Sequence, residues 1–378
     1  MNLIPFNKPF FTGKETTYIK EAVASGKISG DGIFTKKCHH FFEDQLGFKK
    51  VLLTTSCTDA LEMAAILIDI KPGDEVIMPS YTFVSTANAF VLRGAKIIFV
   101  DSRRDHPGLD EDKLESLITE RTKAIIPVHY AGVACDMNKI MNIAAKYSLF
   151  VIEDAAQAID GYYEDKPIGS FGHMAAFSFH ETKNIISGEG GMLVINDERF
   201  VKRAEIIREK GTNRSAFFRG EVDKYGWVDM GSSFLPSDII AAFLYAQLEN
   251  LTLIQNKRKA IWEIYDDAFR GCLDIKYEVQ LPFIPEFTTN NAHMYYLVFK
   301  NKKERKAMLK HLKEKGILAV FHYLSLHKST FYKDIYEGSA MKYSDNYSDC
   351  LIRLPLFPEL DITQQDHIIS SIKSFYAN

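Results

Sequence analysis

The feature that most constrains the fold is a regular alternation of short apolar runs and helix-compatible segments between about residues 50 and 210. The apolar runs are nearly continuous, and we expect them to be strands: Val76–Met78, Lys96–Val100, Ala124–Val128, Leu149–Ile152, Met174–Phe179 and Met192–Ile195. Between most of them lie candidate helices: Asp59–Ile70, Ser85–Arg93, Asp110–Ile118 and Asp136–Lys146. Strands of this kind, separated by helices, are typical of a mainly parallel sheet covered on both faces. The sequence therefore predicts an α/β fold.

The pattern changes in the last third of the chain. Asp238–Ile254 is predicted to be one long amphipathic helix that carries the chain away from the sheet. After it come two apolar segments and two helical ones, at Tyr295–Phe299, Leu318–Phe321, about 302–315 and from about Thr363 onward. We therefore expect a large domain of residues 1–245, including the N-terminal segment, and a small C-terminal α+β domain of residues 246–378.

Composition excludes several classes of function. The formal net charge is −3 over 378 residues, which provides no basic surface for nucleic acid or an anionic membrane. The start of the chain lacks the pattern of a signal peptide, and no apolar run approaches the length of a membrane span. The cysteines are scattered, so neither a disulfide framework nor a metal site is expected: Cys38, Cys57, Cys135, Cys272 and Cys350. We expect a cytoplasmic protein.

Several polar residues follow predicted strands, where parallel sheets bind their ligands. Asp101, His129, Tyr130 and Asp154 lie at strand ends, and Lys183 lies just beyond another strand. A lysine and a carboxylate placed in this way suit pyridoxal phosphate (PLP). The amine forms an imine with the cofactor, and the acid keeps the ring nitrogen protonated. A lone lysine would be read as a surface side chain, but this pattern favours a catalytic one.

A phosphate site is indicated in the segment Thr54–Glu62. Hydroxyl residues followed by an amphipathic run place backbone N–H groups at a helix N-terminus, which favours a phosphate. Plain helix capping is the alternative, because Asp59 and Glu62 have the spacing of a capping box. The Asp59 side chain would repel a phosphate, so only its backbone is expected to make contact.

Aromatic and glycine residues supply further candidates. Phe83 or Tyr81 at a strand end is placed to stack on a flat cofactor ring, although such residues also belong to hydrophobic cores. The glycines of Gly188–Gly191 allow close approach of the backbone to a ligand, or form only a turn.

The motifs together resemble the PLP-dependent nucleotide-sugar aminotransferases of fold type I. Four motifs in order carry the resemblance: Thr55–Thr58, Pro79–Phe83, Glu153–Gln157, and Ser178–Asn184 with Glu189–Gly191. Further segments are most similar to enzymes that make dTDP-4-amino-4,6-dideoxy sugars, namely Pro72–Ile77, Phe83–Gly94, Pro127–Cys135 and Arg208–Ser215. The resemblance implies a large domain with a mainly parallel seven-stranded sheet and a small C-terminal domain.

The resemblance also implies roles for individual residues. Lys183 would hold the cofactor covalently, Asp154 would pair with the pyridinium nitrogen, and Phe83 would stack on the ring. Gln157 would lie near the ring hydroxyl. The phosphate would be held by Ser178 and Thr58 with the backbone of Cys57 to Asp59.

By the same resemblance, glutamate donates the amino group and dTDP-4-keto-6-deoxyglucose accepts it at C4. The product would be dTDP-4-amino-4,6-dideoxy-glucose or -galactose, used for a surface polysaccharide such as an O-antigen. The family also implies a homodimer in which a loop of each subunit completes the other subunit's phosphate site.

Two departures from the family pattern concern that phosphate site and the sugar. Many relatives have an aromatic-Asn pair where this chain has Phe234 and Leu235, and the Asn reaches the phosphate of the neighbouring subunit. Ser232 or Ser233 is a candidate to replace it. The loop Asn184–Gly191 is one residue shorter than in enzymes with a galacto product, which leaves the configuration at C4 open.

Two alternatives remain on the sequence alone. One is a PLP-dependent sugar dehydratase of the same fold, in which histidine replaces the lysine; Lys183 argues against it, but His180 lies nearby. The other is a non-catalytic regulator that binds PLP or a nucleotide sugar, against which the lack of a recognisable DNA-binding element argues.

Overall fold

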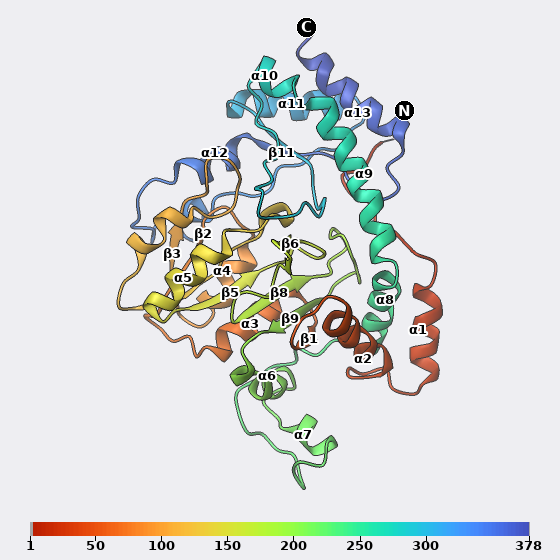
Figure 1. The fold of residues 1–378 in the computed structure, drawn as a ribbon, viewed down its shortest axis with the longest axis vertical. Coiled ribbons are helices and arrows are strands. Elements are labelled where there is room, and N and C mark those ends of the chain that lie inside the picture. Colours follow the sequence, from red (N-terminus) through yellow and green to blue (C-terminus); the bar gives the residue numbers. More distant parts are fainter. Residues whose placement is uncertain (1–2, 378) are drawn as a thin grey trace.

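A computed structural model describes residues 3–377, and its centre is a seven-stranded sheet (Figure 1). The strands are β1 (Val51–Thr54), β2 (Glu75–Pro79), β3 (Lys96–Val100), β4 (Thr122–Ile125), β5 (Phe150–Asp154), β8 (Met174–Ser178) and β9 (Gly191–Ile195). Their order is β1-β9-β8-β5-β4-β2-β3. Strand β9 is antiparallel to both of its neighbours, whereas the other neighbouring pairs are parallel. The predicted mainly parallel α/β sheet is confirmed.

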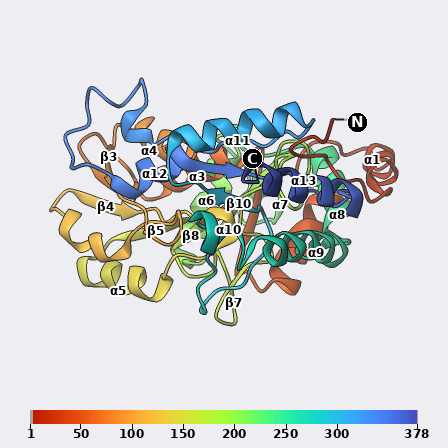
Figure 2. The same ribbon diagram turned by 90° about the horizontal axis from the view of Figure 1, so that it is seen from above.

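Both faces of the sheet are buried because successive side chains of each strand enter two different cores. In β5, for example, Val151 packs into one core and Ile152 into the other. One face carries α3 (Cys57–Leu67), α4 (Val84–Val91) and α6 (Val201–Arg208). The other carries α2 (Ile33–His40), α5 (Met137–Tyr147) and α8 (Asp238–Leu248). Figure 2 shows α4 and α5 on opposite sides of the strands. Helix α1 (Glu15–Ala24) packs on α8.

The predicted single helix at Asp238–Ile254 is wrong. Helix α8 ends at Leu248, and a second helix, α9 (Leu251–Phe269), begins after a short break. At the break, the side chain of Asn250 donates to the carbonyl oxygen of Ala246 over 2.9 Å. This bond satisfies a carbonyl that a continuous helix would use, so the chain turns here and α9 leads to the C-terminal region (Figure 1).

The C-terminal region has its own core and its own small sheet. Strand β10 (Tyr296–Val298) pairs antiparallel with β11 (Leu351–Arg353). Around them lie α10 (Leu273–Tyr277), α11 (Lys302–Glu314), α12 (Lys342–Cys350) and α13 (Ile362–Phe375). The segment expected at Leu318–Phe321 makes only an isolated bridge, between Val320 and Arg353. The domain division between residues 245 and 246 stays a prediction.

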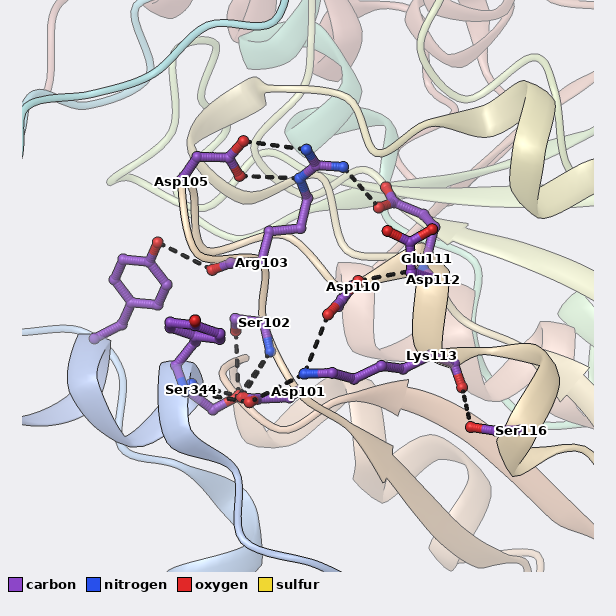
Figure 3. A network of polar contacts seen from close by, with 12 residues as sticks. Asp101, Ser102, Arg103, Asp105, Asp110, Glu111, Asp112, Lys113, Ser116 and Ser344 are labelled. Carbon is purple, nitrogen blue, oxygen red and sulfur yellow. Dashed lines mark hydrogen bonds and ion pairs between the residues drawn. The ribbon is translucent and has the colours of Figure 1, made fainter.

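A polar network after β3 replaces the helix predicted at Asp110–Ile118 and joins the sheet to α12 (Figure 3). Only two single-turn 3-10 helices form there, Glu111–Lys113 and Glu115–Leu117. Asp101 accepts hydrogen bonds from the backbone N–H groups of Ser344, at 2.8 Å, and Tyr343, at 3.2 Å. Asp101 therefore caps the N-terminus of α12 from another part of the chain. Within the predicted helix, Glu111 accepts from Nη1 of Arg103, at 3.1 Å, and from the N–H of Asp136, at 2.8 Å, and these tertiary contacts compete with the local helical pattern.

Residues 211–236 form an arm that extends from the body of the molecule and carries α7 (Arg214–Phe218) (Figure 1). Large apolar side chains are exposed along it, including Phe218, Tyr225 and Trp227, the last with 85% of its surface accessible.

Within the described part of the chain, no helix has the length and apolar character needed to cross a membrane.

Candidate active site

A cavity of about 470 Å³ lies beyond the carboxyl ends of the central strands. Most of the residues that the sequence singled out line it together: Cys57, Thr58, Phe83, Asp154, Gln157, Ser178 and Lys183. His129 lines it as well, whereas Asp101 caps α12 instead. Tyr130 is buried beside the cavity and donates through its hydroxyl to the carbonyl oxygen of His322 over 2.9 Å.

Asp154 is the last residue of β5, and its carboxylate is nearly buried at the base of the cavity. Its Oδ2 accepts a hydrogen bond of 2.6 Å from the hydroxyl of Thr86 in α4, and its Oδ1 accepts one from the N–H of Ala156 at 3.2 Å. The Thr86 hydroxyl also lies 2.9 Å from that of Thr82. The carboxylate is therefore held in a fixed orientation beside the cavity.

Lys183 lies in the loop between β8 and β9 and lines the same cavity. Its backbone N–H donates to the carbonyl oxygen of His180 over 2.9 Å, which fixes the loop. Within residues 3–377 its ammonium has neither a hydrogen-bond acceptor nor an ion-pair partner. Burial first, and the positive charge of Arg353 to a smaller extent, lower the pKa of Lys183 from 10.5 to about 8. The neutral form of the amine, which nucleophilic attack requires, is therefore far more populated near neutral pH than in an ordinary lysine.

The N-terminus of α3 faces the cavity with unused donors. The Ser56 side chain caps the helix by accepting from the N–H of Asp59 over 3.1 Å. The N–H groups of Cys57 and Thr58 have no acceptor in the described chain, and the Thr58 hydroxyl donates to that of Ser85 over 2.8 Å. The Asp59 carboxylate accepts from the Thr55 hydroxyl, and Asp59 is not part of the lining. The predicted capping box of Asp59 and Glu62 is therefore wrong, because Ser56 is the N-cap, whereas the free N–H groups suit an anion.

Gly191 explains part of the glycine cluster. A Cβ atom at this position would lie 2.4 Å from the backbone nitrogen of Cys57 and 2.4 Å from the carbonyl carbon of Ser56. Only glycine lets β9 pass this close to the turn before α3. The glycine is needed for backbone packing beneath the candidate phosphate site.

The two candidate aromatic residues differ in position. Phe83 is the N-cap residue of α4, lines the cavity, and has 54% of its surface accessible. Tyr81 is buried in the core and donates its hydroxyl to the carbonyl oxygen of His322. Of the two, only Phe83 offers a free ring face to a ligand. Gln157 also lines the cavity and is held by the N–H of Ala131, 2.7 Å from its Oε1.

Several cavity residues were not proposed from the sequence as members of this site, among them His293, His322, Tyr323 and Arg353. The Tyr323 hydroxyl accepts from Nε2 of Gln157 over 3.1 Å, and its ring packs on that of Phe83. No sequence signal marks Arg353, because it lies 170 residues from Lys183 in an ordinary apolar strand.

The chemistry of this lining fits PLP. It offers a buried amine of lowered pKa for the aldehyde and a fixed carboxylate for the ring nitrogen. It also offers the exposed ring of Phe83, and free N–H groups at a helix N-terminus for the phosphate.

Comparisons with known proteins agree with this geometry. The pattern of the DegT/DnrJ/EryC1/StrS aminotransferase family matches residues 11–373. The uncharacterised protein MJ1066 of Methanocaldococcus jannaschii is 31% identical over 380 residues, which cover 98% of this chain and 97% of that protein. The structure of Spr1654 from Streptococcus pneumoniae in its PMP form has a TM-score of 0.90 and 28% identity, covering 98% of each chain.

A third comparison is with PseC of Helicobacter pylori, an aminotransferase involved in the biosynthesis of pseudoaminic acid. It has a TM-score of 0.90 and 25% identity, with all of both chains covered. The matched family is PLP-dependent, and Spr1654 is also known in a PLP form. This chain therefore belongs to the DegT/DnrJ/EryC1/StrS aminotransferase family, a family of PLP-dependent sugar aminotransferases, and has PLP as its cofactor.

Proposed function

We propose that this protein transfers an amino group from glutamate, by way of PLP, to C4 of dTDP-4-keto-6-deoxy-D-glucose. The observation that carries the proposal is the convergence of Lys183, Asp154 and the free N–H groups before α3 on one cavity. The family supports aminotransfer to a sugar. The choice of nucleotide, sugar and donor rests on the sequence resemblance.

In this proposal PLP supplies an aldehyde that binds amines and a ring that withdraws electrons from the attached carbon. Lys183 binds the aldehyde through Nζ while the enzyme rests. When free, the neutral Nζ would take the proton from the carbon beside the donor nitrogen. In the second half-reaction the same atom would deliver a proton to C4 of the sugar.

Other residues hold the cofactor in place. Asp154 keeps the ring nitrogen protonated, and its bond from Thr86 fixes the carboxylate for that contact. The N–H groups of Cys57 and Thr58, with the Ser178 hydroxyl, bind the phosphate. Phe83 covers one ring face, and Gln157 lies near the ring hydroxyl. Asp59 contributes through the end of α3 rather than through its carboxylate.

We further propose that the enzyme acts as a homodimer with shared sites. The arm at residues 211–236 supports this, because its exposed aromatic side chains need a partner surface. Leu235 instead lies against its own chain: a Cβ atom at Gly30 would be 2.3 Å from its Cγ. The exposed Ser232 or Ser233 is therefore the candidate donor to the partner's phosphate.

The direct test is to incubate the enzyme with PLP, glutamate and dTDP-4-keto-6-deoxyglucose, and to assign the product at C4 from proton couplings. A 4-amino sugar is expected, and its configuration shows whether the short loop Asn184–Gly191 selects the gluco or the galacto product. No amino sugar would refute the choice of substrate.

Borohydride provides the second test of the proposal. It should attach the cofactor covalently to Lys183, and Lys183→Ala should abolish transamination. Full turnover by Lys183→Ala would refute the mechanism. Elimination of a sugar hydroxyl without amine transfer would instead identify a dehydratase, and binding without turnover would identify a regulator.

A further inference from the structure

A buried hydrogen-bond network starts at Asn184, the residue after Lys183, and ends at His293 in the wall of the cavity. Its members Asn184, Gln255, Asn291 and His293 are each at most 3% exposed. Nδ2 of Asn184 donates to Oε1 of Gln255 and to the carbonyl oxygen of Asn291, both at 2.8 Å. The network therefore ties the loop that carries Lys183 to α9 and to the segment before β10.

The acceptors around this network fix the direction of each donor in it. Nε2 of Gln255 faces the carboxylate of Asp160 and the carbonyl oxygen of Asn291, both at 3.2 Å, and these groups only accept. Oε1 of Gln255 is therefore the end that accepts from Asn184. Both N–H bonds of Asn184 are then in use, so its Oδ1 accepts from Nδ1 of His293, 2.7 Å away. His293 consequently carries its proton on Nδ1.

The second ring nitrogen of His293 is left as a free acceptor. Burial, followed by the charges of Lys183, Arg353 and Arg258, holds the pKa of His293 well below its ordinary value, so the ring is neutral. A neutral ring with its proton on Nδ1 has a lone pair on Nε2. Nε2 makes no hydrogen bond within residues 3–377 and, unlike Nε2 of His106, it is not sealed inside the protein. It is therefore open to the cavity that His293 lines.

Lys183 supplies a donor that matches this acceptor. It lines the same cavity, and its ammonium has no acceptor in the described chain. Its charge acts on the His293 ring more strongly than that of either arginine, so the two groups lie near each other. The carboxylate of Asp154 already accepts from the Thr86 hydroxyl and from the N–H of Ala156. A free donor and a free acceptor thus face one space.

We propose that His293 is a positioning residue for Lys183, and that its Nε2 accepts a hydrogen bond from Nζ whenever the lysine is not bonded to the cofactor. This inference rests on the proposed proton transfers by Nζ. One N–H bond directed at His293 holds the amine still and leaves its lone pair free for the carbon that gives up a proton. The proton stays on Nζ until Nζ delivers it, and His293 remains neutral throughout.

Two substitutions separate the two ring nitrogens. His293→Asn keeps a side-chain N–H near the position of Nδ1 for Asn184 and removes the acceptor at Nε2, whereas His293→Gln places an amide oxygen near Nε2. We expect His293→Asn to lower the maximal rate of both half-reactions about 10- to 100-fold, because the same amine moves the proton in each. The KM values for glutamate and for the nucleotide sugar should not change. His293→Gln should recover part of the rate.

An isotope effect distinguishes positioning from a general loss of structure. Loss of the visible absorbance of the PLP form, with glutamate deuterated at its α-carbon, reports the proton transfer in the donor half-reaction. The isotope effect should be larger in His293→Asn than in the wild type, because proton transfer becomes slow relative to the other steps. General structural damage would slow all steps alike and leave the isotope effect unchanged.

The apoenzyme provides a readout without turnover. Competitive acetylation with acetic anhydride, analysed by mass spectrometry over a range of pH, follows the titration of Lys183. A hydrogen bond to Nε2 stabilises the ammonium, so the midpoint should fall by about one pH unit in His293→Asn. In His293→Gln the midpoint should stay at the wild-type value.

His106→Asn is the matched control. His106 is also buried, and its Nδ1 accepts from the N–H of Gly108 at 3.0 Å, but it lies outside the cavity. The variant should change neither the rates, nor the isotope effect, nor the acetylation midpoint.

Several results for His293→Asn would overturn the proposal: wild-type rates, a loss confined to one half-reaction or to KM, an unchanged isotope effect, or an unchanged acetylation midpoint. If His293→Asn does not fold, His293→Gln decides, since it keeps an acceptor near Nε2, and a lowered midpoint there would refute the proposal. If the wild type does not react with the nucleotide sugar, the proposed acceptor is wrong, whereas acetylation of the apoenzyme still tests His293.

Discussion

The hydroxyl of Thr86 donates to Oδ2 of Asp154 over 2.6 Å and links helix α4 to the end of strand β5. The same helix begins at Phe83, so one element positions both the ring-stacking candidate and the donor to the carboxylate. A short buried bond to an ionised carboxylate is among the stronger hydrogen bonds in proteins.

We expect Thr86→Val, which keeps the side-chain shape, to lower kcat by about tenfold, because a charge-assisted bond contributes about 1.5–3 kcal/mol. Steady-state kinetics with the cofactor absorbance spectrum would measure it. Thr82→Val is the control, since Thr82 contacts the Thr86 hydroxyl and does not contact Asp154. An unchanged kcat in Thr86→Val would show that the bond does not matter for catalysis.

The lowered pKa of Lys183 predicts how the apoenzyme captures its cofactor. Only the neutral amine attacks the aldehyde, so the rate of PLP capture should rise with pH and level off above about pH 8. Stopped-flow absorbance at a series of pH values would measure this. Arg353→Gln should move the midpoint upward, because it removes a positive charge that disfavours the ammonium. A rate that keeps rising to pH 10 would contradict the expectation.

The same shift has a consequence for stability. Since the pKa is 10.5 for an ordinary lysine and about 8 in the fold, the unfolded chain binds more protons between these pH values. This group therefore makes the apoprotein more stable as pH rises through that window. Denaturant unfolding of the apoprotein and of Lys183→Met, which lacks the titrating group, should differ in slope there. Parallel pH profiles would contradict this.

Gly191 should tolerate no side chain. In Gly191→Ala the new Cβ meets the backbone of Ser56 and Cys57, so the turn before α3 must move. We expect a loss of about 1–3 kcal/mol in unfolding free energy and weaker binding of PLP. Fluorescence titration with PLP would follow the second effect. Gly226→Ala is the control, because nothing lies within 4 Å of that Cβ position, and wild-type affinity in both variants would show that the turn is adaptable.

Asp238 joins the N-terminal helices to the body of the protein. Its buried carboxylate accepts from the N–H groups of Phe34 and Thr35 and from the Thr35 hydroxyl, at 3.2, 2.8 and 2.8 Å. Asp238→Asn replaces one acceptor oxygen with an NH₂ group, which cannot accept the hydrogen bonds of α2. We expect it to lower the free energy of unfolding by about 2–3 kcal/mol. Denaturant unfolding measures it. Asp361→Asn, at an exposed N-cap of α13, is the control and should lower the free energy of unfolding much less. Equal losses of stability in the two variants would argue against a special role for Asp238.

Local sequence predicted the sheet and part of the candidate site for the same reason. Buried parallel strands require continuous apolar runs, and ligands gather where such strands end, so Asp154 and Lys183 could be found from short motifs. Strand β1 at Val51–Thr54 was not among the predicted strands. It nevertheless pairs with β9, because a strand at the edge of a sheet is specified by its hydrogen bonds to the neighbouring strand as well as by its own sequence.

The sequence by itself determined the class of the fold, the cofactor chemistry and the residues that follow each strand, since these depend on patterns a few residues long. Tertiary structure alone decided the loss of the helix at Asp110–Ile118, where Glu111 accepts from Arg103 and from the N–H of Asp136. It also decided that Arg353 enters the cavity of Lys183. The contacts of a buried charge come from segments far apart in the chain, and no local pattern records them.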